Sequence, residues 1–250
     1  MESFEHSDIF DGVALPWEVL SKINGYIKNK LSGLKPTGPA EGIELQGGAD
    51  PILYCVKAVK LEADMYCETS RVFIKKGTKI EPGAFIRGPA IIGSDCEVRQ
   101  GAYLRGDFIT GDVCTLGHTT EIKGSIIMNH SEMGHFNYIG DSVIGSYVNI
   151  GAGTKLANLK FRSVEAKKRV EFPELYFVND GNQVKTGISK FGAVIGDYCE
   201  LGCNSVISPA VLFGSECWIY PNATIPSGLY PSRSFLAPEK LKLRTRPLPK

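Results

Sequence analysis

An apolar side chain returns at every sixth position through much of this sequence, and that step limits the possible folds more than any other feature. Thr110 is the only polar member of the two runs, which are Ile74, Ile80, Ile86, Ile92, Val98, Leu104, Thr110, Leu116, Ile122 and Met128, and then Ile195, Leu201, Ile207, Phe213, Ile219 and Ile225. Neither the α-helix nor the alternating strand has this period, whereas a parallel β-helix of hexapeptide repeats does. Two such runs also disfavour a β-sandwich with chance spacing.

We therefore predict an all-β fold, a left-handed parallel β-helix of hexapeptide repeats with a short N-terminal helical segment. Each unit supplies one strand and one turn, three units close a triangular coil, and the repeat residue points into the prism. Coils of this kind are an exception to the right-handed crossover rule. Gly-Asp or Gly-Ser pairs follow several repeat positions, at Gly93, Gly140, Gly145 and Gly196. We expect these glycines at the corners, where glycine tolerates a positive φ.

The chain divides into three expected parts: an N-terminal helix and linker in residues 1–50, the β-helix in residues 51–230, and a C-terminal tail in residues 231–250. Apolar residues at helical spacing predict a helix from Pro16 to Leu31 that packs across the end or side of the β-helix. Residues 52–72 are expected to form irregular first coils. The regular repeat should begin near Ile74 and end after Pro226.

Residues 159–189 break the repeat and are expected to leave the prism as an insert. Within them, residues 176–178 fit one strand of a hairpin that turns at Asn179-Asp180-Gly181. A basic run, Lys167-Lys168-Arg169, precedes that hairpin. The run is either a solvated surface or a contact to an anionic ligand, and the sequence leaves both interpretations open.

Composition narrows the class of protein. The 250 residues are 43% apolar and 22% charged with a net charge of +1, so neither nucleic acid nor a membrane surface is expected as a partner. No apolar stretch approaches the ~20 residues that span a bilayer, and the acidic N-terminus has no signal-peptide core, so a cytoplasmic protein is expected. The seven cysteines form no CxxC pair, and no metal site is predicted.

The segment from Gly134 to Asn158 holds the side chains with the most chemistry. Positions 12, 18 or 30 apart fall on neighbouring coils, so we expect one edge of the prism to carry Arg105, Lys123, His135, Tyr138, Asn149 and Asn158. A histidine base works near neutral pH, and an Arg and a Lys beside it favour a phosphate. Together with a tyrosine hydroxyl and asparagine amides, the set suits acyl transfer to an amine on a phosphorylated substrate. Arg105 and Lys123 fit solvated corner residues equally well.

These residues also carry a family resemblance. The segments LRGD, TEIK and GHFNYIGDSVIGSYVNIGAGTKLAN, and then KFGAVIGDYCELGCNSVISPAVLFG, resemble the acetyltransferase half of the bifunctional N-acetylglucosamine-1-phosphate uridyltransferase/glucosamine-1-phosphate acetyltransferase family. The insert and the PWEVL helix resemble archaeal-type sugar-1-phosphate nucleotidyltransferases that carry a C-terminal β-helix. The resemblance covers about half of the chain.

The resemblance implies roles for individual residues. His135 matches the catalytic base, and Asn149 and Asn158 match residues that contact the sugar. Four residues match those that hold the sugar phosphate: Arg105, Lys123, Tyr138 and Lys190. Ala152 and Cys203 match positions beside coenzyme A, although the family often has a serine where this chain has Cys203.

The implied function is a sugar N-acetyltransferase that moves acetyl from acetyl-CoA to the amine of an aminosugar phosphate, such as glucosamine-1-phosphate, in UDP-N-acetylglucosamine and cell-envelope precursor synthesis. The resemblance also implies a homotrimer with its active site between subunits. Residues 1–70 contain no Gly-rich nucleotide loop, so uridyltransferase activity is not expected of this chain alone. Two alternatives remain: a sugar-nucleotide-binding or scaffold β-helix without activity, and a partner of a separate nucleotidyltransferase subunit.

Overall fold

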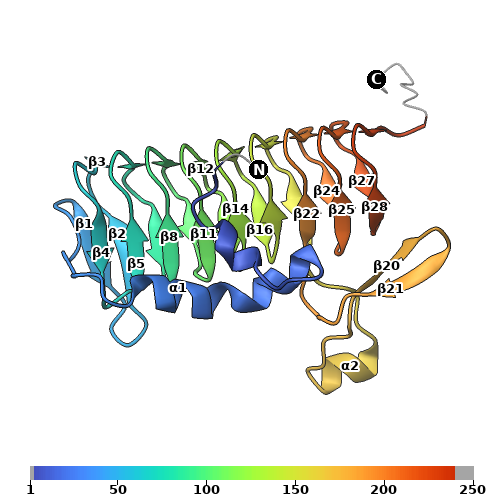
Figure 1. Ribbon diagram of the computed structural model, residues 1–250, viewed down its shortest axis with the longest axis horizontal. Coiled ribbons are helices and arrows are strands. Elements are labelled where there is room, and N and C mark those ends of the chain that lie inside the picture. The colour runs from blue at the N-terminus through green and yellow to red at the C-terminus, as the bar shows by residue number, and fades with distance from the viewer. Residues whose placement is uncertain (1–2, 240–250) are drawn as a thin grey trace, which may run out of the picture.

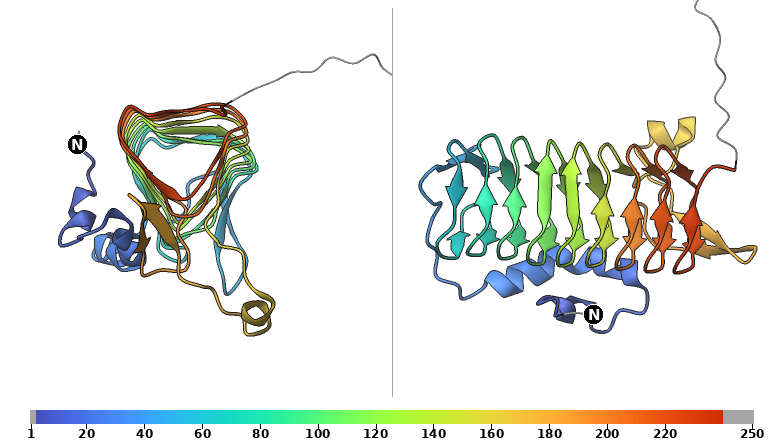
Figure 2. Two further views of the ribbon diagram at one scale, coloured as in Figure 1. Left: turned by 90° about the vertical axis from the view of Figure 1, so that its right-hand side faces the viewer. Right: turned by 90° about the horizontal axis from the view of Figure 1, so that it is seen from above.

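The protein is a three-sided β-solenoid of about nine coils with helices along one side, as seen in a computed structural model that describes residues 3–239 (Figure 1). Viewed down the long axis, successive coils lie over one another and trace a triangle (Figure 2). Each side of the triangle is a nine-stranded sheet. The predicted hexapeptide β-helix with an N-terminal helix is confirmed, and its left-handed sense stays a prediction.

The three sheets, here called A, B and C, take their strands in rotation along the chain. Sheet A contains β1 (Ile43–Gln46), β2 (Ile52–Cys55), β7 (Phe85–Arg87), β10 (Tyr103–Leu104), β13 (Glu121–Lys123), β16 (Tyr138–Gly140), β19 (Lys155–Leu156), β24 (Val206–Ile207) and β27 (Thr224–Ile225). Sheet B contains β3 (Val59–Lys60), β6 (Lys79–Ile80), β9 (Glu97–Val98), β12 (Thr115–His118), β15 (Glu132–His135), β18 (Asn149–Ile150), β23 (Glu200–Leu201), β26 (Trp218–Ile219) and β29 (Phe235–Leu236). Sheet C contains β4 (Met65–Cys67), β5 (Val72–Ile74), β8 (Ala90–Ile92), β11 (Phe108–Thr110), β14 (Ile126–Ile127), β17 (Val143–Ile144), β22 (Ala193–Ile195), β25 (Val211–Phe213) and β28 (Gly228–Tyr230).

Identical positions of successive coils stack inside the prism. In sheet A, Leu104 pairs with Ile122 and Ile122 with Ile139, and all three side chains are fully buried. The polar exception is satisfied by a hydrogen bond, because the Gly93 N–H donates to the buried Thr110 Oγ1 at 3.1 Å. The six positions predicted from Ile195 to Ile225 all belong to this core.

The step of six shortens to five after Ile122, which the repeat did not predict. Thr110 pairs with Ile127, and Ile127 occupies the interior position that we expected for Met128. Met128 instead faces outward and packs with the N-terminal segment. The expectation for Met128 was therefore wrong, because this corner is one residue shorter than those of the preceding coils, and the next coil repeats the short step from Ile139 to Ile144.

The expected reason for glycine at the corners was also wrong. None of Gly93, Gly140, Gly145 and Gly196 has a positive φ. The positive φ falls one or two residues later, for example at Asp141 (48°) and Tyr198 (60°). Glycine is needed for close approach between coils: a Cβ on Gly93 would lie 2.1 Å from the Gly111 carbonyl oxygen.

The N-terminal end of the coil is closed by antiparallel strands. β2 pairs with β7, β3 with β6, and β4 with β5, all antiparallel, whereas β5 and β6 pair in parallel with the next coil. These pairs replace the irregular coils expected in residues 52–72. At the other end, β28 and β29 continue the sheets, so the prediction that the repeat ends after Pro226 was wrong. The part of the predicted tail in residues 240–250 lies outside the described residues.

The N-terminal segment covers the outer face of sheet C (Figures 1 and 2). It comprises the 3-10 helices η1 (Ser7–Phe10) and η2 (Pro16–Lys22) and the α-helix α1 (Ile23–Leu31). The helix predicted from Pro16 to Leu31 is therefore confirmed, and its first seven residues form a 3-10 helix instead of an α-helix. Ile23 and Ile27 are fully buried and pack with Ile109 and other outward-facing residues of sheet C. Among the described residues, no helix has the length and apolar content required to cross a membrane.

The insert leaves the prism after β19 and returns before β22. It contains α2 (Val164–Lys168) and the predicted hairpin, β20 (Tyr176–Asn179) with β21 (Asn182–Lys185). The hairpin is anchored to η2, because the Trp17 Nε1–H donates to the Thr186 carbonyl at 2.9 Å and the Trp17 ring contacts Phe177 and Phe191. The basic run lies at the end of α2, which projects away from the prism (Figure 1).

We expect Gly117→Ala to lower the free energy of unfolding by about 1–3 kcal/mol, the usual cost of overpacking. A Cβ at Gly117 would lie 2.0 Å from the Gly134 carbonyl oxygen, so two adjacent coils would have to separate. Denaturant unfolding of the purified variant measures the change.

The matched control is Gly25→Ala in α1, where a Cβ would meet no atom within 4 Å. Replacing glycine in an exposed helix interior should raise the free energy of unfolding by about 0.5–1 kcal/mol. Equal effects of the two substitutions would contradict the close approach of coils as the reason for Gly117.

Candidate functional site

The corner between sheets B and A aligns three of the predicted site residues. His135 ends β15, and Ala152 and Cys203 occupy the equivalent corner positions of the next two coils. Backbone hydrogen bonds connect them, since the Gly153 N–H donates to the His135 carbonyl at 2.9 Å and the Asn204 N–H to the Ala152 carbonyl at 2.8 Å. The candidate base and both candidate coenzyme positions therefore form one column, here called the corner column, parallel to the solenoid axis.

Two amides of the corner column are available to a ligand. In the IGAGT turn, the N–H groups of Gly151, Gly153 and Thr154 all donate to backbone carbonyls. The N–H groups of Ala152 and Cys203 have no acceptor within residues 3–239. Both can therefore donate to an oxyanion or to the amide carbonyls of an extended ligand.

The His135 ring is exposed and forms no hydrogen bond to any residue from 3 to 239. Its backbone N–H donates to the Asn137 Oδ1 at 3.2 Å, which fixes the main chain at the corner. His118 pairs with His135 on the preceding coil, and its Nδ1 lies 2.8 Å from the Gln100 carbonyl oxygen. The sequence did not single out His118, and only the register places it here.

A second group, here called the polar cluster, lies on the outer face of sheet A toward sheet C. Arg105 forms an ion pair with Glu121, with 2.6 Å between Nη1 and Oε1. Lys123 forms another with Asp141, with 2.7 Å between Nζ and Oδ2, and the Asn158 amide also donates to that oxygen. The structure thus brings Arg105, Lys123 and Asn158 together as predicted, and it adds two carboxylates that sequence reasoning missed.

Tyr138 begins β16 and faces outward beside this polar cluster, paired in register with Glu121. Burial raises the pKa of its phenol, and the carboxylates of Asp141 and Glu121 raise it further. The hydroxyl therefore keeps its proton near neutral pH and can donate a hydrogen bond to an anion.

The remaining two predicted residues occupy different places. Lys190 lies where the insert rejoins the coil, next to Phe191, whose N–H donates to the Asn158 carbonyl at 3.1 Å. Its ammonium lies 5.3 Å from the centre of the Phe172 ring. Asn149 is on the outer face of sheet B, where its amide donates to Glu200 at 2.8 Å. The prediction that one edge carries the whole set was therefore wrong, because His135 lies at the edge of sheet A toward sheet B, the polar cluster lies at the edge toward sheet C, and Asn149 lies on sheet B.

Within the described part of the chain, the other reactive groups do not form a metal centre. All seven cysteines are free, and Cys203 alone is exposed. Across residues 3–239 there is no group of three or more His, Cys, Asp or Glu side chains placed to hold a metal ion. The groups that can take part in a reaction are therefore the His135 imidazole and the two backbone amides of the corner column that have no acceptor among the described residues, and the cations, carboxylates and phenol in and beside the polar cluster.

The coil and this site define the chain as a hexapeptide-repeat β-solenoid. No protein-family model matches it. Over the β-helix it is homologous to GlmU and to an archaeal bifunctional sugar-1-phosphate nucleotidylyltransferase/acetyltransferase. The latter, from Sulfurisphaera tokodaii, is 40% identical over 109 residues, which are 44% of this chain and 25% of that protein.

Longer matches come from the bifunctional protein GlmU of two methanogens. The protein from Methanococcus maripaludis is 30% identical over 90% of this chain and 46% of its own length, and that from Methanococcus vannielii is 29% identical over 88% and 45%. The chain thus spans less than half the length of these relatives.

Among solved structures, a variant of AntD is similar, an N-acyltransferase from Bacillus cereus in complex with dTDP-4-amino-4,6-dideoxyglucose and coenzyme A. The match has a TM-score of 0.32 and 16% identity over 70% of this chain and 82% of that chain. We infer nothing about this chain from that structure, because the TM-score is below 0.5.

We expect Asp141→Asn to lower the pKa of Tyr138, because one of the two negative charges that raise it is removed while the acceptor oxygen for Asn158 is kept. Tyrosine Cζ NMR shifts during an alkaline titration measure this pKa. Because the pKa of Tyr138 in the folded protein is higher than its ordinary value of about 10, the protonated phenol contributes to the stability of the fold at neutral pH. That contribution is lost as the pH rises above about 10 and through the folded pKa.

Glu200→Gln is the matched control, since Glu200 lies on sheet B and bonds to Asn149. It should leave the pKa of Tyr138 unchanged. A pKa that is the same in wild type and in Asp141→Asn would contradict the coupling.

Proposed function

We propose that the protein is a sugar N-acyltransferase that transfers acetyl from acetyl-CoA to the amine of an aminosugar phosphate such as glucosamine-1-phosphate. The observation that carries the proposal is the corner column, in which an unpaired histidine lies one coil from an open backbone amide. Homology to the bifunctional GlmU proteins over the β-helix supports it.

His135 is the proposed general base. The amine attacks the thioester carbonyl only in its neutral form, and the nitrogen must lose a proton as the C–N bond forms. His135 accepts that proton, and the leaving thiolate of coenzyme A takes it as the C–S bond breaks. The Ala152 N–H is the proposed donor to the tetrahedral oxyanion, since a preorganised amide stabilises that charge.

Arg105, Lys123, Tyr138 and Lys190 are the proposed phosphate ligands. The ion pairs with Glu121 and Asp141 hold Arg105 and Lys123 in place before a ligand arrives, and Lys190 has no carboxylate partner among the described residues. Tyr138 donates its retained proton. The carboxylates can accept hydrogen bonds from sugar hydroxyls, and Asn158 is the proposed sugar contact on this face.

The acyl donor is proposed to lie along the corner column. Ala152 and Cys203 each offer a backbone N–H that has no acceptor among the described residues, and the pantetheine arm of coenzyme A carries amide carbonyls that need donors. At Cys203 the contact is proposed through the backbone, so a thiol in place of a hydroxyl does not weaken it.

A homotrimer accounts for the position of Asn149. Sheet C is covered by the N-terminal helices, which leaves sheets A and B free on either side of the corner column. A closed ring of subunits places sheet B of one copy beside sheet A of the next. Asn149 of one subunit would then face the polar cluster of its neighbour and contact the same sugar.

His135→Ala should lower kcat by about 10²–10⁴-fold, the usual contribution of a general base. Thiol release from acetyl-CoA, with glucosamine-1-phosphate and then other aminosugar phosphates as acceptors, measures the rate. Calorimetry should show that acetyl-CoA still binds to the variant. Wild-type activity in His135→Ala, or no turnover with any aminosugar, would refute the proposal.

His130→Ala is the control. His130 is half-buried and stacks on the Tyr147 ring at 4.6 Å, at the corner between sheets B and C. Its removal should change kcat little, because this corner lies away from the corner column.

Light scattering of the purified protein at micromolar concentration should give three times the mass of one chain. Asn149→Ala in such a trimer should raise KM for the aminosugar while the mass stays the same. A monomeric mass together with full activity would show that the site is complete within one chain.

A further inference from the structure

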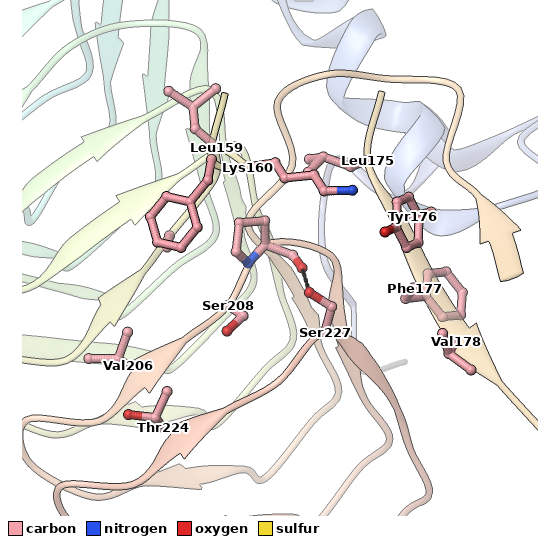
Figure 3. Close-up of a pocket in the computed structure, with 13 residues that line it drawn as sticks. Leu159, Lys160, Leu175, Tyr176, Phe177, Val178, Val206, Ser208, Thr224 and Ser227 are labelled. Carbon is pink, nitrogen blue, oxygen red and sulfur yellow. Dashed lines mark hydrogen bonds between the residues drawn. The ribbon is translucent and has the colours of Figure 1, made fainter. Parts of the chain in front are cut away.

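Sheet A carries a pocket of about 520 Å³ next to the polar cluster, and no step of the proposed reaction uses it (Figure 3). Its floor is the outer face of β19, β24 and β27, with Val206, Ser208 and Thr224, and its opposite wall is β20 of the insert. Pockets of 300–1,000 Å³ take whole small molecules. One phosphate or one acetyl group would leave most of this volume empty.

The pocket begins where the polar cluster ends. Asn158, which donates to Asp141, is followed in the chain by Leu159 and Lys160 in the pocket wall. From β13, which holds Lys123, the sheet continues through β16 and β19 to β24 at the pocket floor. Three strand spacings of ~4.8 Å amount to about 14 Å, so one extended ligand can reach both places.

The direction of that ligand follows from the two edges of sheet A. His135 lies at the edge toward sheet B, whereas Arg105, Lys123 and Asn158 lie at the edge toward sheet C, from which the insert leaves. A sugar with its amine at His135 therefore has its phosphate on the insert side. The group that enters the pocket is therefore bonded to the phosphate. An acyl chain on the thioester would instead start from the opposite edge of sheet A, where His135 lies.

The lining fits an aromatic ring with a polar edge. The Tyr176 ring forms part of the wall, and the Lys160 ammonium lies 3.6 Å from its centre (Figure 3). The Ser227 hydroxyl is already used, since it donates to the Pro209 carbonyl at 2.6 Å. The hydroxyls of Ser208 and Thr224 have no partner among residues 3–239, so they can bind the edge of a heterocycle.

The wall formed by the insert is held in place without a ligand. Phe177, on β20, is buried and packs with Trp17, Phe191 and Leu212. Trp17 also donates its hydrogen bond to Thr186, just after β21. A hairpin anchored at both strands presents Tyr176 and Val178 to the pocket in a fixed position.

We infer that this pocket binds the nucleoside of a nucleotide-linked aminosugar, so that a nucleoside diphosphate aminosugar is the preferred acceptor and glucosamine-1-phosphate a weaker one. The inference rests on the proposed function for the sugar and its amine, and it deepens that function by naming the class of acceptor. The polar cluster then binds the diphosphate, and Tyr176 stacks on the base.

Calorimetric titration with uridine diphosphate and with glucosamine-1-phosphate tests this without any turnover. The nucleotide should bind at least about tenfold more tightly. Tyr176→Ala should weaken its binding by about tenfold or more, as loss of a stacked aromatic ring does. Val206→Trp, which fills the pocket from the sheet side at a half-exposed position, should have the same effect, and glucosamine-1-phosphate should bind both variants as it binds wild type.

Tyr220→Ala is the matched control, because Tyr220 is 39% exposed on the sheet B side and Tyr176 is 38% exposed. It should leave nucleotide binding unchanged. The inference is overturned if uridine diphosphate does not bind, if neither pocket variant weakens it, or if coenzyme A competes with it for the pocket.

The acyl-transfer assay separates this inference from the proposed function. Acetylation of glucosamine-1-phosphate with no binding of the nucleotide would overturn only the pocket assignment. Nucleotide binding that depends on Tyr176, with no acylation of any aminosugar, would overturn the enzyme and leave a nucleotide-binding β-helix.

Discussion

Every coil of this protein depends on the coil beneath it having the same shape. An interior side chain such as Ile122 is buried only because Leu104 and Ile139 occupy the same position on either side. The backbones come so close that the Gly93 and Gly117 positions leave no room for a Cβ. In a stack of this kind, the free energy of unfolding is approximately the sum of the intrinsic stability of each coil and of its contacts with the adjacent coils.

The period of six was sufficient to predict the fold because it reflects this stacking directly. It was not sufficient to locate the shortened corner after Ile122, since Ile127 and Met128 are both apolar and either could face inward. It also misassigned the reason for the corner glycines. Close approach between coils and a positive φ both favour glycine, and only coordinates tell them apart.

Sequence spacing likewise predicted part of the candidate site and missed the rest. Residues separated by one coil, such as Arg105 and Lys123, were correctly brought near one another from spacing alone. Asn149 was not, because three residues are enough to move from the corner to the middle of a side. Glu121 and Asp141 were overlooked because in the sequence they look like an ordinary strand residue and a turn residue, and only their ion pairs with Arg105 and Lys123 reveal them.

The insert also has a consequence for how the chain folds. Val143 pairs with Val194, 51 positions later, whereas Ile126 pairs with Val143, 17 positions later, and the register on either side of the insert is undisturbed. The entropy of closing a loop grows only with the logarithm of its length, so this threefold longer closure costs about 1 kcal/mol. Coils before and after the insert can each grow by adding neighbours, and they need to join only once. The extra loop closure that brings a whole pocket wall to one corner of the solenoid therefore costs about as much free energy as the loss of one core methyl group.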